Sequence, residues 1–341
     1  MHFPSAPAAA VASLRELLAR SRSIAIVTHF NPDGDALGSS FGLCSVLKKL
    51  GHKAIVVLPN TPPQNLQWMP GFTDAVAWDK DKEASERTVR ESDLLFCLDF
   101  NKPDRVGALE PALRAATTKV LIDHHRHPDT FAAVSFSDIQ ACSTAQMVFD
   151  IVNALGHGEL IDAHAATCLY TGIMTDSGSF RFNSTTPHTL EVAAELMKRG
   201  VVPERIHEAI MDDNTEVRLK LLGFALNERL TVYQELRTAV IVLSNDDLLR
   251  YNYQPGDTEG LVNYGLSIRG IRMAAFIVER PDIVKLSLRS KGALPVNEFL
   301  TQHFNGGGHG NAAGGHAKEP LANVVERFLR EVPAFLSAHP A

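Results

Sequence analysis

Short apolar runs alternate with stretches of helical spacing through the first half of the chain, and this alternation constrains the fold most. The runs are Ile24 to Val27, Ala54 to Leu58, Leu94 to Leu98 and Val120 to Ile122. Between the first two, Asp35 to Leu50 has helical spacing and Gly51 ends it. Buried strands separated by helices are typical of βαβ units, in which helices cover both faces of a parallel sheet. We therefore predict an α/β fold with a doubly wound, mainly parallel N-terminal sheet.

The second half of the chain predicts a smaller α/β domain. Helical patterns dominate from about residue 142 to 228, and strand-like runs return at Thr238 to Leu243, Arg272 to Val278 and Val284 to Leu288. A helix over Leu321 to Leu336 follows them. The predicted division is a first domain at residues 1–185, a helical connector at 186–229 and a second domain at 230–341.

The composition of the chain limits the kinds of molecule that we expect it to bind. The 341 residues are 45% apolar, enough for a full core, and the formal net charge is -6. That charge disfavours long duplex nucleic acid, which is bound through an excess of Lys and Arg, but allows a small anionic ligand. Four scattered cysteines, no secretory pattern at the start and no apolar run of about 20 residues lead us to expect a cytoplasmic protein without a membrane partner.

Metal-ligand side chains follow three of the four predicted N-terminal strands. The first strand is followed by His29-Phe30-Asn31-Pro32-Asp33-Gly34-Asp35, another by Asp99, and the last by Asp123-His124-His125. Ligands of open parallel sheets gather at the carboxyl ends of the strands. The sequence therefore predicts several carboxylates and imidazoles at one edge of the sheet.

Each of these elements also has a purely structural interpretation. Asp33-Gly34 is a common turn, Asp35 suits the start of a helix, and Asp99 alone suits a loop or a cap. His29 and the adjacent His124 and His125 are not explained in this way. Because all the structural interpretations would have to hold together, we favour a functional cluster.

A fourth element completes the predicted metal site. Asp176 lies in Thr171 to Arg181, after a helical apolar run and before a turn rich in Ser and Gly; its structural alternative is a helix stop. Carboxylates gathered in one cleft repel each other, and a bound cation holds them ionised. Imidazole and carboxylate ligands without thiolate favour Mn²⁺, with Mg²⁺, Co²⁺ and Fe²⁺ as lesser candidates and Zn²⁺ still open.

A glycine cluster at residues 306–315 surrounds His309 and follows Arg289 in the chain. The cluster lacks the Lys of a phosphate-binding P-loop, and the preceding helical pattern does not fit a dinucleotide-binding fingerprint. Glycines let backbone N–H groups approach an anion, and Arg binds phosphate with two hydrogen bonds. A flexible loop beside a surface Arg is the alternative.

Together these motifs resemble the DHH family of phosphoesterases, in the subfamily that adds a DHHA1 domain. His29 to Ala36 is similar to the first family motif, Asp99 to the second, Asp123-His124-His125 to the motif that names the family, and Thr171 to Arg181 to the fourth. Gly306 to Gly315 is similar to the DHHA1 signature. The resemblance spans nearly the whole chain.

The resemblance implies a role for each site residue. One Mn²⁺ would be held by His29, Asp33 and Asp99, and a second by Asp35, Asp99, His124 and Asp176. Asp123 would orient the DHH segment, and His125 would face the substrate phosphate. Nucleotide binding across a cleft would involve Arg289, His309, Asn263, Gly307 and Gly308. Many relatives have Lys or another larger residue where Gly310 stands, so the direct cationic contact of those relatives is not expected here.

The resemblance further implies hydrolysis of short oligoribonucleotides, of 3'-phosphoadenosine 5'-phosphate, or of both, by water activated between two metal ions. A stand-alone phosphodiesterase for cyclic di-AMP or its product pApA is the main alternative, and a non-catalytic nucleotide- or RNA-binding module is a further one. A family II pyrophosphatase would end in a different motif, and a RecJ-like exonuclease would be longer. A homodimer is compatible with the sequence.

Overall fold

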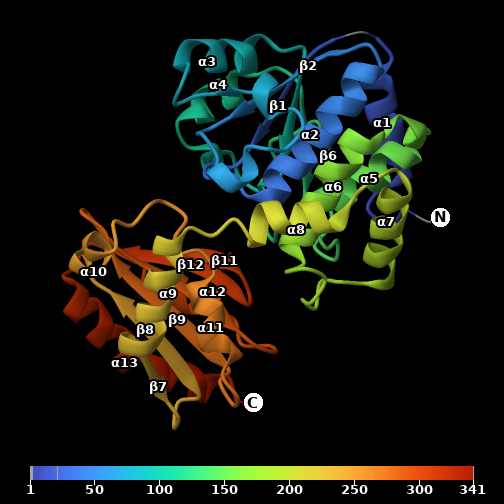
Figure 1. Ribbon diagram of the computed structural model, residues 1–341. Coiled ribbons are helices and arrows are strands. Elements are labelled where there is room, and N and C mark those ends of the chain that lie inside the picture. Colours follow the sequence, from blue (N-terminus) through green and yellow to red (C-terminus); the bar gives the residue numbers. More distant parts are fainter. Residues whose placement is uncertain (1–2, 21, 341) are drawn as a thin grey trace. The chain divides into compact units, whose positions relative to one another are not determined.

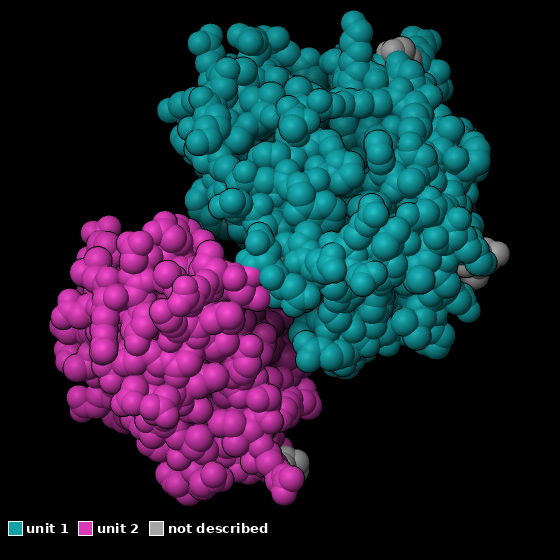
Figure 2. Space-filling model, viewed as in Figure 1, with its two compact units in different colours: residues 1–213 teal, residues 214–341 magenta. Residues whose placement is uncertain are grey.

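A computed structural model describes residues 3–20 and 22–340 of the chain. It consists of two compact units, residues 1–213 and 214–341 (Figure 2). Each unit contains a six-stranded sheet with helices packed against it (Figure 1). The predicted α/β class is confirmed, and the three-part division at residues 185 and 229 stays a prediction.

The sheet of unit 1 is wholly parallel, with the strand order β3-β2-β1-β4-β5-β6. Its strands are β1 (Ser23–Thr28), β2 (Lys53–Leu58), β3 (Val76–Ala77), β4 (Leu94–Leu98), β5 (Lys119–Asp123) and β6 (Val134–Ser137). The order of strands reverses between β1 and β4, which lie side by side. In doubly wound sheets such a reversal opens a crevice at the carboxyl ends of the strands.

Alternate residues of these strands serve two cores, as the pleat of a strand requires. In β1, Ile24 and Ile26 join one core, and Ala25 and Val27 join the other. The first core packs against α1 (Ala8–Leu18), α2 (Gly34–Lys49), α5 (Thr144–Ala154), α6 (Ala163–Asp176), α7 (Pro187–Lys198) and α8 (Pro203–Met211). The second packs against α3 (Lys82–Glu91), α4 (Glu110–Ala115) and the 3₁₀ segment η3 (Pro103–Leu109). Short 3₁₀ turns η1 (Gln64–Leu66), η2 (Phe72–Asp74) and η4 (Gly158–Leu160) complete unit 1.

Helices α2 and α6 pack unusually closely. A Cβ atom on Gly38 would lie 2.4 Å from the Cys168 carbonyl oxygen, and one on Gly172 would lie 2.9 Å from Oδ1 of Asp35. Side chains at either position would therefore push the helices apart. The two glycines bring the start of α2, with Asp35, toward the end of α6, with Asp176.

The sheet of unit 2 is mainly antiparallel, with the order β11-β12-β10-β9-β8-β7 and one parallel pair, β8 with β9. Its strands are β7 (Leu230–Tyr233), β8 (Thr238–Leu243), β9 (Met273–Glu279), β10 (Val284–Ser290), β11 (Gly307–His309) and β12 (Ala312–Ala317). Helices α12 (Val296–His303) and α13 (Leu321–Ala338) contribute to one core. Helices α9 (Glu216–Glu228), α10 (Asn245–Arg250) and α11 (Leu261–Ser267) contribute to the other.

The glycine cluster at residues 306–315 is not a flexible loop, as one interpretation of the sequence had it. It forms the hairpin of β11 and β12 at the edge of the second sheet. Gly308 has φ +132, and a Cβ atom there would lie 2.7 Å from the Ala312 carbonyl oxygen. The glycines therefore allow the two strands to pair closely. Glycine is generally unfavourable in strands, so residue propensities alone do not predict this hairpin.

Helices α7, α8 and α9 occupy the stretch for which the sequence predicted helices without strands. Helices α7 and α8 belong to unit 1, and α9 belongs to unit 2. Within residues 3–20 and 22–340, no helix combines the length and the apolar character that crossing a membrane requires.

Candidate metal centre

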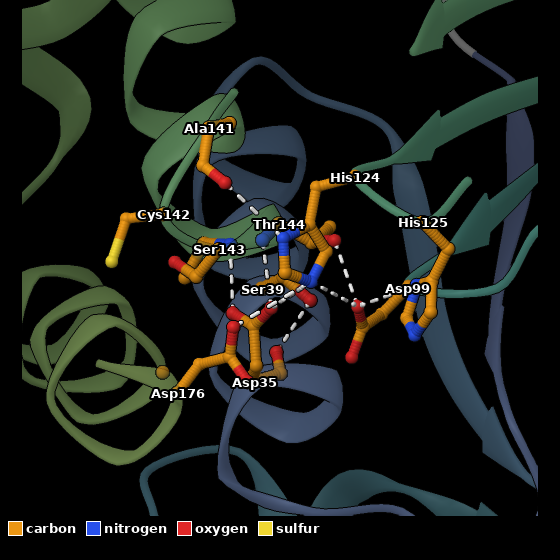
Figure 3. A network of polar contacts seen from close by, with 12 residues as sticks. Asp35, Ser39, Asp99, His124, His125, Ala141, Cys142, Ser143, Thr144 and Asp176 are labelled. Atoms are coloured by element: carbon orange, nitrogen blue, oxygen red, sulfur yellow. Dashed lines mark hydrogen bonds and ion pairs between the residues drawn. The ribbon is translucent and has the colours of Figure 1, made fainter. Parts of the chain in front are cut away.

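The chemistry-bearing residues of unit 1 gather where its parallel strands end. His29 follows β1, Asp99 follows β4, and Asp123 is the last residue of β5. Asp99 has φ +64, a conformation that non-glycine residues adopt rarely and that concentrates at functional sites. Figure 3 shows Asp99 beside His124 and His125, with Asp35 and Asp176 on the other side of the His124 ring. The strand-end prediction therefore describes the geometry of this edge correctly.

One group that could hold a metal ion consists of His29, Asp33 and Asp99. Nε2 of His29 lies 3.5 Å from Oδ2 of Asp99 and 3.8 Å from Oδ1 of Asp33. Nδ1 of His29 lies 3.0 Å from the carbonyl oxygen of Phe30. If Nδ1 donates to that carbonyl, Nε2 is left as the electron-pair donor, as a metal ligand requires.

A second group consists of Asp35, His124 and Asp176. Nε2 of His124 lies 3.6 Å from Asp176 and 3.9 Å from Asp35, and it is also 3.6 Å from Asp99 (Figure 3). These distances exceed those of hydrogen bonds. Nδ1 of His124 faces the Ala141 carbonyl oxygen at 3.3 Å, so His124 is oriented in the same manner as His29.

Helix α5 fixes two of these carboxylates. The backbone N–H groups of Thr144 and Ala145 donate to Asp35 at 2.7 and 2.8 Å, and the Thr144 hydroxyl donates to Oδ1 of Asp99 at 2.9 Å. The sequence analysis missed Thr144. The signal was the N-cap Ser143 before an apolar helical run, which places a helix N-terminus, with its unpaired N–H groups, after β6.

Asp123 and His125 form a third arrangement, together with Asp99. Oδ1 of Asp123 lies 2.7 Å from Nδ1 of His125, and Oδ2 accepts the His125 backbone N–H at 3.2 Å. Asp123 is fully buried. Its carboxylate therefore fixes the orientation of the His125 ring.

The electrostatics of this cluster favour a bound cation. Burial, reinforced by the charge of Asp99, raises the pKa of Asp35 well above its usual range. Burial also raises the pKa of Asp176 to about 7, although His124 opposes this effect. The carboxylates of the cluster repel each other, since, besides burial, the charges of Asp99 and Asp176 both contribute to the raised pKa of Asp35. This donor set fits a divalent metal ion, which would compensate for that repulsion.

The predicted substrate-binding residues all lie in unit 2. Arg289 of β10 pairs with Ala312 of β12, and Ala312 pairs with His309 of β11, so the three residues form one row across the sheet. Directly opposed residues point to the same face, so Arg289 and His309 flank the small Ala312 side chain. Burial lowers the pKa of the Arg289 guanidinium, and Glu259 opposes that shift.

The remaining predicted residues surround this row. Gly307 and Gly308 are exposed on β11, and Asn263 is exposed on α11, which packs beside β9 and β10. The neighbouring row pairs Ser287 with Gly314 and Gly314 with Gly307. Small residues therefore lie between Arg289 and His309 and in the row beside them.

Comparison with known proteins identifies the family. Residues 23–173 match the model of the DHH family, N-terminal domain, and residues 234–338 match that of the DHHA1 domain. The chain is 33% identical to the bifunctional oligoribonuclease and PAP phosphatase NrnA of Thermus thermophilus, over 91% of the chain and 89% of that protein. The chain belongs to the DHH family.

Two other comparisons cover this DHH protein almost completely. NrnA of Bacillus subtilis is 27% identical over 93% of the chain and 96% of the relative. The crystal structure of an exopolyphosphatase-related protein from Bacteroides fragilis superposes with a TM-score of 0.94 at 34% identity, covering 96% of this chain and 97% of that one. The predicted resemblance is therefore confirmed over both domains.

Proposed function

We propose that this DHH protein is a divalent-metal-dependent phosphoesterase that hydrolyses short oligoribonucleotides and 3'-phosphoadenosine 5'-phosphate. The observation that carries the proposal is the group of carboxylates and imidazoles at the edge of the parallel sheet, most of which are buried and of which Asp33 is exposed. The names of the relatives NrnA, which describe an oligoribonuclease and a PAP phosphatase, support the choice of substrates.

Two ions are proposed, with Mn²⁺ preferred. His29, Asp33 and Asp99 would hold one, and Asp35, His124, Asp176 and Asp99 the other. The support is geometric: Oδ2 of Asp99 is directed toward His29, and Oδ1 is directed toward His124. Bound ions would neutralise phosphoryl oxygens and acidify a water molecule.

His125 would face the substrate phosphate, and Asp123 would hold the His125 ring in position. Burial lowers the pKa of His125, but the hydrogen bond with Asp123 and the charge of Asp99 outweigh burial and raise it above its usual value. The ring therefore stays protonated to a higher pH than a free imidazole. A fixed imidazolium would stabilise negative charge on a phosphoryl oxygen as the phosphoester bond breaks.

Unit 2 would bind the nucleotide. Arg289 would bind a phosphate with two hydrogen bonds, and His309 and Asn263 would contribute further polar groups. Gly307 and Gly308 leave the edge strand without side chains, so a ligand could approach its backbone closely. A cytoplasmic location, small nucleotides and very short RNA as partners, and a homodimer belong to the same proposal.

Product analysis with purified protein tests the proposal. Incubation with Mn²⁺ should release products from 3'-phosphoadenosine 5'-phosphate and from RNAs of two to five nucleotides faster than from pApA or cyclic di-AMP. A preference for cyclic di-AMP or pApA would favour the alternative activity. Binding of all four compounds without turnover would favour a non-catalytic module.

Metal removal gives a second test. Chelator treatment should abolish the activity, and Mn²⁺ should restore it better than Mg²⁺, Co²⁺ or Zn²⁺, because the proposed ligands are imidazole and carboxylate. Full activity after complete metal removal would refute the proposal. Restoration by Zn²⁺ alone would change the assigned metal and leave the site in place.

A further inference from the structure

The aromatic ring of Phe30 is half exposed beside the candidate metal centre. Half of its surface is accessible, although its neighbour His29 is buried. The main chain of Phe30 is anchored on both sides: its carbonyl oxygen lies 3.0 Å from Nδ1 of His29, and its N–H donates to the Arg105 carbonyl oxygen at 2.7 Å. The backbone at Phe30 is therefore fixed relative to His29, while the ring stays half exposed.

Gly107 supports the Phe30 ring from one side. A Cβ atom on Gly107 would lie 3.3 Å from Cδ2 of Phe30 and 3.6 Å from Cγ. Gly107 also has φ +57 and ψ -127, a backbone conformation that only glycine adopts readily. One side of the ring thus packs on the backbone at Gly107, and its exposed half presents a flat apolar surface to solvent.

Arg105 contributes a cation to the same segment. It lies six residues after Asp99 and two before Gly107, and its side chain is exposed. Its charge reaches the buried cluster, where it opposes the raised pKa of His125. Among the residues that the structure describes, no carboxylate forms an ion pair with it. The exposed Phe30 ring and the Arg105 cation therefore lie on two neighbouring segments, which the hydrogen bond from the Phe30 N–H to the Arg105 carbonyl oxygen joins beside His29.

We propose that Phe30 and Arg105 form a nucleotide subsite in unit 1, in which a base stacks on Phe30 and Arg105 binds the phosphate that is not hydrolysed. The subsite rests on the proposed phosphoesterase function and deepens it. Stacking tolerates any base, because every base has a π-face. Arg binds phosphate with two parallel hydrogen bonds, which Lys cannot reproduce. The subsite thus selects nucleotides over simple phosphate esters without reading sequence.

Phe30 is tested by comparing two substrates, 3'-phosphoadenosine 5'-phosphate and its base-free analogue ribose 3,5-bisphosphate. Phe30→Ala and Phe30→Leu should lower kcat/KM for the nucleotide roughly tenfold, the scale of losing one stacked base. Phe30→Trp should retain the wild-type value, and the base-free analogue should change less than about twofold. Leu190→Ala, at an exposed apolar residue of α7, is the matched control.

Arg105 is tested with a substrate that lacks the second phosphate. Arg105→Gln should raise KM for 3'-phosphoadenosine 5'-phosphate roughly tenfold and leave 3'-AMP nearly unchanged, and Arg105→Lys should recover only part of the loss. Arg87→Ala on α3 is the matched control for loss of an exposed cation. A 2-aminopurine nucleotide should lose fluorescence on binding to the wild type and retain it with Phe30→Ala.

These outcomes separate the subsite from the underlying activity. A wild type that hydrolyses the nucleotides while Phe30→Leu and Arg105→Gln behave like their controls overturns the subsite alone. Equal losses on the nucleotide and the base-free analogue would assign Phe30 to supporting His29 and also overturn it. A wild type that hydrolyses no nucleotide overturns the proposed function and the subsite together.

Discussion

Units 1 and 2 contain sheets of equal strand number that place their polar residues differently. In unit 1 the strands are parallel, so the residues that follow them meet at one edge. In unit 2 most neighbouring strands are antiparallel, and Arg289 and His309 lie in a row across a face of the sheet. The parallel sheet concentrates charge at an edge, whereas the antiparallel sheet presents a surface.

The polar residues of the two units also differ in burial and charge. Asp35 and Asp99 are only 1% and 2% exposed, and they belong to a cluster with excess negative charge. The residues around Arg289 and His309 are small, and those at Gly307 and Gly314 are exposed. A cluster of largely buried carboxylates suits a metal ion. An exposed surface of small residues beside an Arg suits an anionic ligand. We infer that the chemistry belongs to unit 1, and that unit 2 contributes to ligand recognition in addition to the proposed subsite at Phe30 and Arg105.

The largest expected effect comes from Asp99→Ala, which should abolish turnover. Asp99 is directed toward both His29 and His124, so its loss disturbs both proposed coordination spheres. The rate of hydrolysis at saturating Mn²⁺ is the measurement. Asp93→Ala is the matched control, because Asp93 directly precedes β4 whereas Asp99 directly follows it. Near-wild-type turnover by Asp99→Ala would contradict the two-metal assignment.

Arg289→Ala and His309→Ala should have the next largest effect. Each should lower kcat/KM for nucleotide substrates roughly 10²-fold, as expected when one preorganised donor to a phosphoryl group is lost. Bound manganese should stay near the wild-type level, and bis(p-nitrophenyl) phosphate should be affected much less. Both substrates and the metal content are to be measured on the same preparations.

His316→Ala is the control for this pair. His316 is exposed on β12, two pairs along the same face from Ala312. It should behave like the wild type. The division between the units would fail if Arg289→Ala and His309→Ala impaired both substrates equally with metal content intact, or impaired neither.

A smaller effect is expected from Thr144→Val. The substitution removes the hydroxyl that donates to Asp99 and keeps the backbone N–H that donates to Asp35. Residues that orient metal ligands affect metal affinity by about 10- to 100-fold, and we expect the lower end for Mn²⁺ titrated into metal-free protein. Thr167→Val, at an exposed hydroxyl on α6, should leave the affinity unchanged. If Thr144→Val and the wild type bound Mn²⁺ with equal affinity, Thr144 would have no supporting role at the metal centre.

The smallest effect concerns pH. The pKa of Asp176 rises from its usual acidic value to about 7 in the metal-free fold, mainly because of burial. A raised carboxyl pKa stabilises the fold at low pH, and this contribution is lost as pH rises from about 4 to 7. Thermal unfolding of metal-free protein should therefore show declining stability over that range. Added Mn²⁺ should reverse the trend, because it binds the ionised carboxylates. An opposite slope without metal would contradict the repulsion argument.

The parallel half of the fold could be predicted because its strands are continuous apolar runs. The runs at Leu94 to Leu98 and Ala54 to Leu58 coincide with β4 and nearly with β2. Strands β3 and β6 were not foreseen, because β3 has two residues and Val134–Ser137 alternates between buried and exposed positions. Hairpin β11–β12 was missed because its glycines normally indicate a loop.

The residues at the strand ends could be predicted for the same reason, since strand direction fixes where they meet. The closeness of Asp176 to Asp35 and His124 could not be derived in this way. It depends on the close approach of α2 and α6, which Gly38 and Gly172 permit and which no local pattern announces. Thr144 also required a tertiary contact, because its hydroxyl donates to a residue 45 positions away.

Anomalous X-ray diffraction at the manganese edge, from crystals grown with Mn²⁺, tests the central claim most directly. We expect two peaks at the carboxyl edge of the parallel sheet, one beside His29 and one beside His124, with Asp99 touching both ions. The peaks should disappear after chelation, and none should lie in unit 2. A single peak, or ions bound away from Asp99, would contradict the claim that unit 1 is a two-metal centre.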